Sequence, residues 1–138
     1  MKLTENTLNV LTNYASINPN IVIEQGNILK TVSGAKNIMA FSTVDTVFPS
    51  DFGIYDLNEF LNAIDMIDQP EFLYESENKS VIIRSEDKTC SIKYFFSDPK
   101  ILVSPSKDID MPECEVEFEL GESDLNNIKR ASSTFRAD

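Results

Sequence analysis

Three amphipathic helices, each opening with a polar capping residue, restrict the fold of this sequence more than any other feature. They are expected to begin near Thr4, Asp56 and Ser123, at intervals of roughly 50 to 70 residues. A short strand is expected to lead into each helix, and strand-forming segments follow the first two. This recurrence predicts a duplicated unit of one helix and several antiparallel strands, used twice and then begun again. We therefore expect an α+β fold.

The helical segments are predicted from caps and apolar spacing. Thr4 is placed to cap a helix over residues 4–15, and Asp56 and Glu59 have the spacing of a capping box. Ser123 is expected to cap the third helix. The apolar stripe of the second helix, which ends at residues 68–70, consists of Leu57, Phe60, Leu61, Ile64 and Ile67, and that of the third consists of Leu125, Ile128 and Phe135.

Between the helices, apolar runs bounded by turn residues predict strands. They cover residues 21–23, 28–32, 38–41, 43–48, 52–55, 71–74, 81–85 and 90–96, with a hairpin turn at 25–27. Residues 98–112 hold half of the six prolines, which predicts an extended connector. After it, glutamates alternate with apolar residues over 113–120, which predicts one more strand. Because a strand and a helix cannot bury their apolar faces alone, this last part indicates a truncated sequence or a partner surface.

The glutamates at 113, 115, 117 and 119 are interpreted as a solvated strand face, because alternate carboxylates on one strand cannot surround a hard cation. The same alternation places Cys114 on the apolar side. Cys90 and Cys114 have no Cys-x-x-Cys spacing, so buried structural thiols are favoured over a redox pair. Asp108 and Asp110 lack the glycine and distal glutamate of an EF-hand.

Composition argues against a self-contained enzyme. The sequence has no His, and its four glycines form no phosphate-cradling loop. We therefore expect no catalytic residue, no metal site and no cofactor. Its longest apolar run is far shorter than the roughly 20 residues that cross a bilayer, so no membrane span is expected.

Charge is distributed unevenly along the chain. With 12 Lys and Arg against 23 Asp and Glu, the net charge is −11, which argues against indiscriminate nucleic-acid binding. The first two helices contain no Lys or Arg, whereas Lys129, Arg130 and Arg136 cluster in the third. Two interpretations stay open: these cations contact phosphates, or they occupy a solvated helix face near the negative end of the helix dipole.

Several segments resemble the sliding clamps, or DNA polymerase processivity factors, of T4-like bacteriophages. The strongest is 52–61, Phe-Gly-Ile-Tyr-Asp-Leu-Asn-Glu-Phe-Leu, which resembles the strand and second helix of that family. Residues 13–18 resemble the end of the family's first helix, 101–107 with 111–112 its connector, and 124–130 the first helix of its second domain. The similarity extends over nearly the whole chain in matching order.

The resemblance implies a DNA-clamp fold with a first domain at 1–97, a connector at 98–112 and the start of a second domain at 113–138, the N-terminal part of the clamp. It implies a homotrimeric ring that encircles duplex DNA independently of sequence, is opened by a clamp loader and tethers a DNA polymerase. That role involves no catalysis, no cofactor and no membrane, and it belongs to the cytoplasm of the infected bacterial host. Lys129, Arg130 and Arg136 then fall where the family places a helix facing the hole, and Lys2 is the nearby candidate in the first domain.

Two other functions remain as alternatives. An acidic DNA mimic, or inhibitor, would occupy a DNA-binding partner with carboxylates that imitate phosphates. The net charge and the glutamates at 113–119 favour it, while the cations of the third helix do not. A small enzyme is disfavoured by the missing His and the missing phosphate loop.

Overall fold

The computed structural model describes residues 2–75, 77, 79–105 and 113–135. The chain divides into two compact units, Met1–Lys107 and Asp108–Asp138. The first unit contains α1 (Glu5–Ala15), β1 (Ile21–Ile23), β2 (Gly26–Val32), β3 (Met39–Phe48), β4 (Phe52–Ile54), α2 (Leu57–Asp65), β5 (Glu71–Glu75), β6 (Ser80–Arg84), β7 (Ser91–Phe95) and the 3₁₀ turn η1 (Pro99–Ile101). The second contains α3 (Glu122–Phe135).

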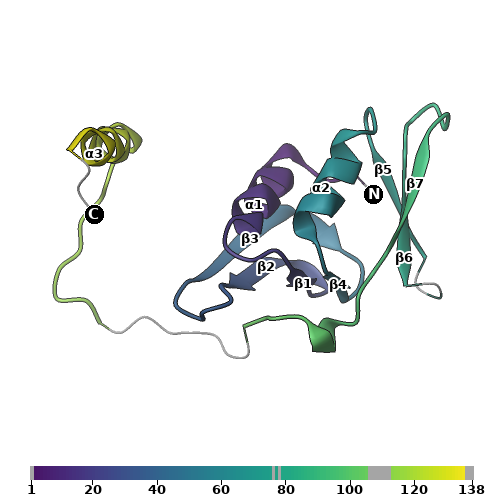
Figure 1. The fold of residues 1–138 in the computed structure, drawn as a ribbon, viewed down its shortest axis with the longest axis horizontal. Helices are drawn as coiled ribbons and strands as arrows, with labels where there is room; N and C mark the ends of the chain where they lie inside the picture. The colour runs from purple at the N-terminus through teal and green to yellow at the C-terminus, as the bar shows by residue number, and fades with distance from the viewer. Residues whose placement is uncertain (1, 76, 78, 106–112, 136–138) are drawn as a thin grey trace. The chain divides into compact units, whose positions relative to one another are not determined.

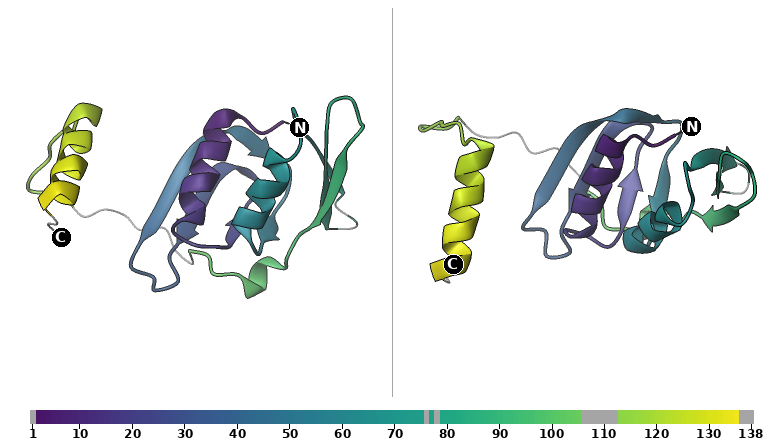
Figure 2. Two further views of the ribbon diagram at one scale, coloured as in Figure 1. Left: turned by 45° about the horizontal axis from the view of Figure 1, so that its top comes forward. Right: turned by 90° about the horizontal axis from the view of Figure 1, so that it is seen from above.

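Two antiparallel sheets form the first unit. One has the strand order β3-β2-β1-β4 and the other β5-β6-β7, with Ile23 opposite Leu29 and Val81 opposite Tyr94. Helices α1 and α2 lie side by side on one face of the four-stranded sheet (Figures 1 and 2). Each helix precedes its own set of strands, which confirms the expected α+β fold and the repeated helix-and-strand unit.

Local capping explains where the first two helices begin. The Thr4 hydroxyl accepts a hydrogen bond from the Thr7 amide at 3.2 Å, and the Asp56 carboxylate accepts one from the Glu59 amide at 2.9 Å. Each bond satisfies an amide that has no partner inside the helix. Helix α2 ends at Asp65, three residues earlier than the sequence predicted, although Ile67 beyond it remains buried.

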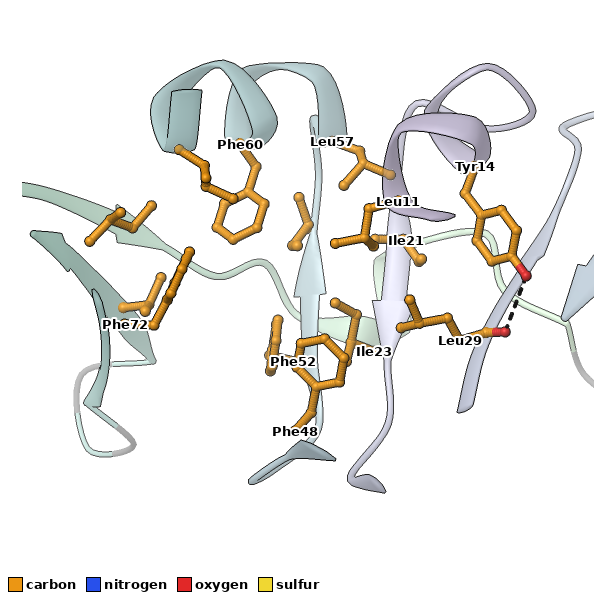
Figure 3. Close-up of a cluster of buried hydrophobic side chains, with 14 of the residues drawn as sticks. Leu11, Tyr14, Ile21, Ile23, Leu29, Phe48, Phe52, Leu57, Phe60 and Phe72 are labelled. Carbon is orange, nitrogen blue, oxygen red and sulfur yellow. Dashed lines mark hydrogen bonds between the residues drawn. The ribbon is translucent and has the colours of Figure 1, made fainter. Parts of the chain in front are cut away.

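One apolar core runs beneath both helices and continues to the three-stranded sheet (Figure 3). Leu11 and Leu57 face the four-stranded sheet, while the Phe60 ring meets that of Tyr94 on β7 with centroids 5.0 Å apart. Helix α2 therefore joins the two sheets. The Tyr14 hydroxyl, at the other side of the core, donates hydrogen bonds to the Leu29 carbonyl at 3.5 Å and the Ser42 hydroxyl at 3.0 Å.

Strand β3 differs from its prediction. The sequence indicated two separate runs around Ser42, but β3 is one strand of ten residues, Met39–Phe48. Ser42 pairs with Leu29 of β2 within the ladder, and its side chain is engaged by Tyr14. A single polar residue therefore does not end the strand, because tertiary partners satisfy both its backbone and its hydroxyl.

The prediction that a strand leads into every helix is wrong for two of the three. Strand β4 precedes α2, but the described residues before α1 form no strand, and neither do residues 113–121 before α3. The glutamate-rich segment is exposed throughout, and Cys114 is exposed rather than buried, as is Cys90. A strand needs a hydrogen-bonded neighbour, and no described strand pairs with this segment.

Helix α3 also differs from expectation. It begins at Glu122, so Ser123 lies inside the first turn instead of capping it. Its predicted apolar side is exposed, with Leu125 at 40%, Ile128 at 55% and Phe135 at 80%. Burial of that stripe requires a covering surface that the described part of the second unit does not supply. None of the described helices has the length and apolar character that a membrane crossing requires.

Residues 97–103, where the sequence predicts the start of a connector, are held against the rest of the first unit. The Ser97 amide donates to the Gly53 carbonyl at 2.8 Å, and Leu102 packs close over Gly53. The Asn18 side-chain amide donates to the carbonyls of Val32 at 2.8 Å and Val103 at 3.3 Å, which ties the connector to β2. The predicted connector segment is therefore fixed in place as far as Val103, and it is not extended throughout, because η1 forms a turn at Pro99–Ile101.

Candidate nucleic-acid interface

The outward face of the α1–α2 pair, the side of the two helices away from the sheet, exposes uncharged polar side chains together with three carboxylates. Thr7, Leu11 and Tyr14 of α1 are buried, and Leu8 and Val10 between them pack partly against the core. The other residues between Thr7 and Tyr14 are exposed. The exposed amides and hydroxyl of this face belong to Asn6, Asn9, Thr12, Asn13, Asn58 and Asn62. These groups can both donate and accept hydrogen bonds.

No Lys or Arg occurs in α1 or α2, both of which are fully described. Their charged residues are the exposed carboxylates of Glu5, Glu59 and Asp65. Binding to this face would release no phosphate counterions, because that release requires cationic side chains. Its amides could still form hydrogen bonds to phosphate oxygens, which position nucleic acid without reading sequence.

Helix α3 carries Arg130 on a different side from its apolar stripe, whereas Lys129 borders the stripe. With about 100° of rotation per residue, Lys129 lies about 40° from Leu125, and Arg130 lies about 200° from Ile128. Both cations lie in an exposed part of the helix. The hydroxyls of Ser133 and Thr134 donate to the carbonyls of Lys129 and Arg130, each at 2.8 Å, and so bond back to the preceding turn of the helix. A surface covering the stripe would leave Arg130 facing away from it.

The remaining candidates do not join that pair. Lys2 belongs to the first unit, where its ammonium lies 3.9 Å from the Glu86 carboxylate in the β6–β7 turn. Both side chains are more than half exposed, so this ion pair is weak and leaves Lys2 able to exchange partners. Arg136 lies outside the described residues. The structure therefore brings Lys129 and Arg130 together, and it places Lys2 on a separate body.

Comparison with known proteins decides the family. The family described as DNA polymerase processivity factor matches residues 3–103. This chain belongs to the DNA polymerase processivity factor family. The matched residues contain α1, α2 and both sheets, so membership in the processivity factor family rests on the first unit.

Curated relatives in three bacteriophages are named sliding clamps. The sliding clamp of Vibrio phage KVP40 is 29% identical over 137 residues, which cover 97% of this chain and 61% of the relative. That of Enterobacteria phage T4 is 29% identical and that of Escherichia phage RB69 28% identical, each over all of this chain and 60% of the relative. The chain thus spans about three-fifths of the length of the curated relatives it matches.

Neither shifted pKa values nor clusters of metal-ligating residues mark the outward face of the α1–α2 pair as a site. Among the described residues, no three His, Cys, Asp or Glu side chains gather closely enough to hold a metal ion. Asp108 and Asp110 lie outside the described residues. The pKa of Asp87 is lowered by hydrogen bonds from Ser85 and Thr89, and burial raises the pKa of Tyr94. These shifts come from a turn and from the core.

Sequence reasoning missed how the connector is held. The sequence analysis gave Asn20 no role, yet its side-chain oxygen accepts the Val103 amide at 3.2 Å. Gly53 was treated as an ordinary strand residue, although a Cβ there would lie 2.5 Å from Leu102 Cδ1. The signal was present in the sequence as small and amide-bearing residues, but their partners lie far along the chain.

Proposed function

We propose that this chain is the N-terminal part of a sliding-clamp subunit. In this proposal residues 1–97 form the first clamp domain, 98–112 the connector and 113–138 the start of the second domain. The family match over residues 3–103 is the observation that carries the proposal. This chain covers only about 60% of the length of the phage clamps. That coverage supports the assignment of the residues after 103 to the connector and the start of a second domain.

The proposed activity involves no bond making or breaking. Three complete subunits close into a ring around duplex DNA, a clamp loader opens that ring, and the polymerase is tethered to it. Tethering raises the effective concentration of polymerase at the primer end, so processivity does not require tight DNA binding. In this proposal the work takes place in the cytoplasm of an infected bacterium, which the bacteriophage origin of the relatives supports.

The distribution of charge supports a ring that encloses DNA without binding it tightly. A chain with net charge −11 is repelled by DNA at long range, and the outward face of the α1–α2 pair adds no cation. Lys129, Arg130 and Arg136 are the proposed DNA-facing residues of the second domain, with Lys2 in the first. Each phosphate contact contributes a slope of about −0.9 in log K against log salt, so few contacts give a weak and mobile association.

The exposed apolar residues of the second unit fit the same proposal. Val116 and Phe118 are 77% and 80% exposed, and the stripe of α3 is exposed as well. We infer that the rest of the second domain covers them in the complete protein. The strand predicted over 113–120 would then form when its hydrogen-bonding neighbour is present.

Clamp loading on nicked circular DNA tests the proposal. The complete protein, with its cognate loader and ATP, should remain on the circle after the loader is removed and should leave when the circle is linearised. A nicked circle blocked at one site provides the matched control, because linearisation near the block slows release. Retention on linear DNA with free ends, or failure to load at all, would reject enclosure.

The acidic-mimic alternative rests on the net charge and on the absence of cations from α1 and α2. It predicts salt-sensitive binding to a basic DNA-binding enzyme, with duplex DNA as a competitor. The clamp proposal predicts binding to the polymerase that DNA does not displace. A competition assay at two salt concentrations therefore separates the two functions.

A further inference from the structure

One edge of the three-stranded sheet is open. Strand β7 is the last strand in the order β5-β6-β7, and no described strand pairs with its other side. It lies on the opposite side of the first unit from β2 and β3 (Figure 1). The unpaired backbone groups of an edge strand can pair with a strand from another chain.

The hydrogen bonds at the two ends of the β6–β7 ladder show which backbone groups of β7 are unpaired. The Phe96 amide donates to the Lys79 carbonyl at 2.8 Å, and the Ser85 amide donates to the Cys90 carbonyl at 3.0 Å. Because hydrogen-bonded pairs alternate along an antiparallel ladder, the even-numbered residues of β7 bond to β6. The odd-numbered residues turn their N–H and C=O groups toward the open edge, and these are Ser91, Lys93 and Phe95.

The two faces of β7 differ in what an added strand would meet. Ile92 and Tyr94 pack against the core, but both remain only partly buried. On the other face Phe95 is 65% exposed, and the Lys93 ammonium lies 2.7 Å from the Glu75 carboxylate. The Lys93 side chain is still 40% exposed, and an ammonium has three donors, so it can accept a second carboxylate. The edge therefore fits a strand that is apolar on its inner face and acidic on its outer face.

Residues 113–120 have this pattern. Glutamates occupy the odd positions from 113 to 119, and Val116, Phe118 and Leu120 occupy even positions. Val116 and Phe118 are 77% and 80% exposed, and no described strand pairs with the segment. The segment has the length of a strand and lacks a neighbour, whereas β7 is a strand with one open edge.

Antiparallel pairing of the segment with β7 matches both faces at once. Residues directly opposite each other in such a ladder point to the same face. If Glu117 lies opposite Lys93, the two can exchange both backbone hydrogen bonds, and their side chains form an opposite-charge pair. Val116 then lies opposite Tyr94, so the apolar residues of the segment extend the core.

The open edge of β3 fits the segment less well. Asp45 projects from the exposed face of β3, so glutamates on that face would meet a like charge. With the segment turned over, its glutamates would be buried against the core. The direction of the chain favours a second copy as the source of the segment, because Ser104 and Pro105 lie beside Val22 and Ile28, across the first unit from β7.

We propose that two copies of this chain associate by strand addition, with residues 113–120 of each copy paired antiparallel with β7 of the other. Exchange of an element between identical chains is a low-cost route to a closed dimer. Main-chain hydrogen bonds supply the affinity of such a contact, and alternate side chains supply its specificity. The proposal goes beyond the proposed clamp function, because it requires neither DNA nor a ring. In a complete clamp subunit, the rest of the second domain would compete for the segment.

Sedimentation equilibrium of the 138-residue chain over a concentration series tests the association. The weight-average mass should rise from 15.6 kDa toward twice that value. Lys93→Pro removes an N–H at the open edge and no bond to β6, and it should raise the dimer Kd by about tenfold or more. The matched control is Lys93→Thr, which loses the same ammonium and its pairing with Glu75 but keeps the N–H. It should raise Kd by less than about fivefold.

A second pair of variants tests the segment. Glu117→Pro should weaken association as Lys93→Pro does, whereas Glu117→Gln, which keeps the N–H, should have the smaller effect. Residue 117 lies outside every described helix and strand, so Glu117→Pro leaves the first unit intact even if Lys93→Pro disturbs β7. Thermal unfolding checks the fold of each variant.

Nuclear magnetic resonance locates the contact. The ¹⁵N-labelled Glu117→Pro chain keeps an intact β7 edge, and the unlabelled Lys93→Pro chain keeps an intact segment. Addition of the second to the first should shift the amides of Ser91, Lys93 and Phe95 most. Addition of unlabelled Glu117→Pro chain should leave these amides unshifted.

Three outcomes would overturn the proposal. They are a mass of one chain at every concentration, equal effects of the proline variants and their controls, and amide shifts that map to β3 or elsewhere outside β7. Failure of the loading assay would leave these results unaffected, so the two proposals are tested independently.

Discussion

Gly53→Ala should overpack and loosen the contact of β4 with Ser97 and Leu102. A Cβ built at Gly53 would lie 2.5 Å from Leu102 Cδ1 and 2.8 Å from the Ser97 carbonyl oxygen. The Leu102 methyl group can move by rotating its side chain. The Ser97 carbonyl is backbone, and the Ser97 amide is itself bonded to the Gly53 carbonyl, so the chain there has little freedom to yield.

The magnitude follows from the two ways in which the structure can respond. Retaining the docked connector means overpacking, which costs about 1–3 kcal/mol. Releasing it exposes Leu102, now 9% exposed, at about 1.5–3 kcal/mol, and loses one backbone hydrogen bond worth about 0.5–1.5 kcal/mol. The molecule takes the less costly response. We therefore expect a loss of about 1–3 kcal/mol in the free energy of unfolding.

Urea denaturation and amide hydrogen exchange measure the two parts of this prediction. The control is Gly34→Ala, because no atom lies within 4 Å of a Cβ built there, and it should stay within about 0.5 kcal/mol of the natural chain. Exchange at Ser97 and Val103 should accelerate in Gly53→Ala and not in the control. Equal denaturation midpoints for the two alanine variants would refute the close-packing argument.

Phe60→Ala should lower the free energy of unfolding by about 3–5 kcal/mol in urea denaturation, because Phe60 is 3% exposed; an unchanged midpoint would contradict its place in the core. Asn18→Ala should cost about 1–3 kcal/mol and accelerate exchange of the Asn20 amide, which Asn18 Oδ1 accepts at 3.0 Å; unaltered exchange would show that this bond is dispensable. Burial raises the pKa of Tyr74, so stability should be complete below about pH 10 and fall as the pH rises further, and Tyr74→Phe should reduce that fall in pH-dependent unfolding. Lys129→Glu with Arg130→Glu, made in the complete protein, should weaken loading on circular DNA without changing its melting temperature; unchanged loading at physiological salt would show that these residues do not face DNA.

Elements whose signals are local were predictable from the sequence. Asp56 caps α2 through a bond to an amide three residues away, and Leu57, Phe60 and Ile64 form the stripe that the core buries. The strands β5, β6 and β7 follow their apolar runs within one residue at every end. Each of these features depends on neighbours within a few positions, which a single sequence displays directly.

Features that depend on distant partners were not predictable. The bond between Val103 and Asn20 joins residues 83 positions apart, and the closeness of Leu102 to Gly53 emerges only after the chain has folded back. In the 113–120 segment, by contrast, the sequence predicted a strand that the structure does not have. Polar and apolar residues alternate there as in a strand, but no described strand lies beside the segment to pair with it. For the candidate interface, the sequence indicated that Lys129 and Arg130 lie close together. It did not indicate which other charged residues they contact.

The two units differ in what holds them together, and this bears on how the cations of α3 could act. The first unit buries its own core, with Leu11, Leu29 and Ile54 fully enclosed. Helix α3 has 14 residues and buries none of them, and an isolated helix of that length is marginal in water. Any orientation of Lys129 and Arg130 toward DNA therefore depends on a surface that covers the stripe of α3. In the proposed clamp, the missing part of the second domain would supply both the cover and the orientation, so DNA contact through α3 would be a property of the assembled protein.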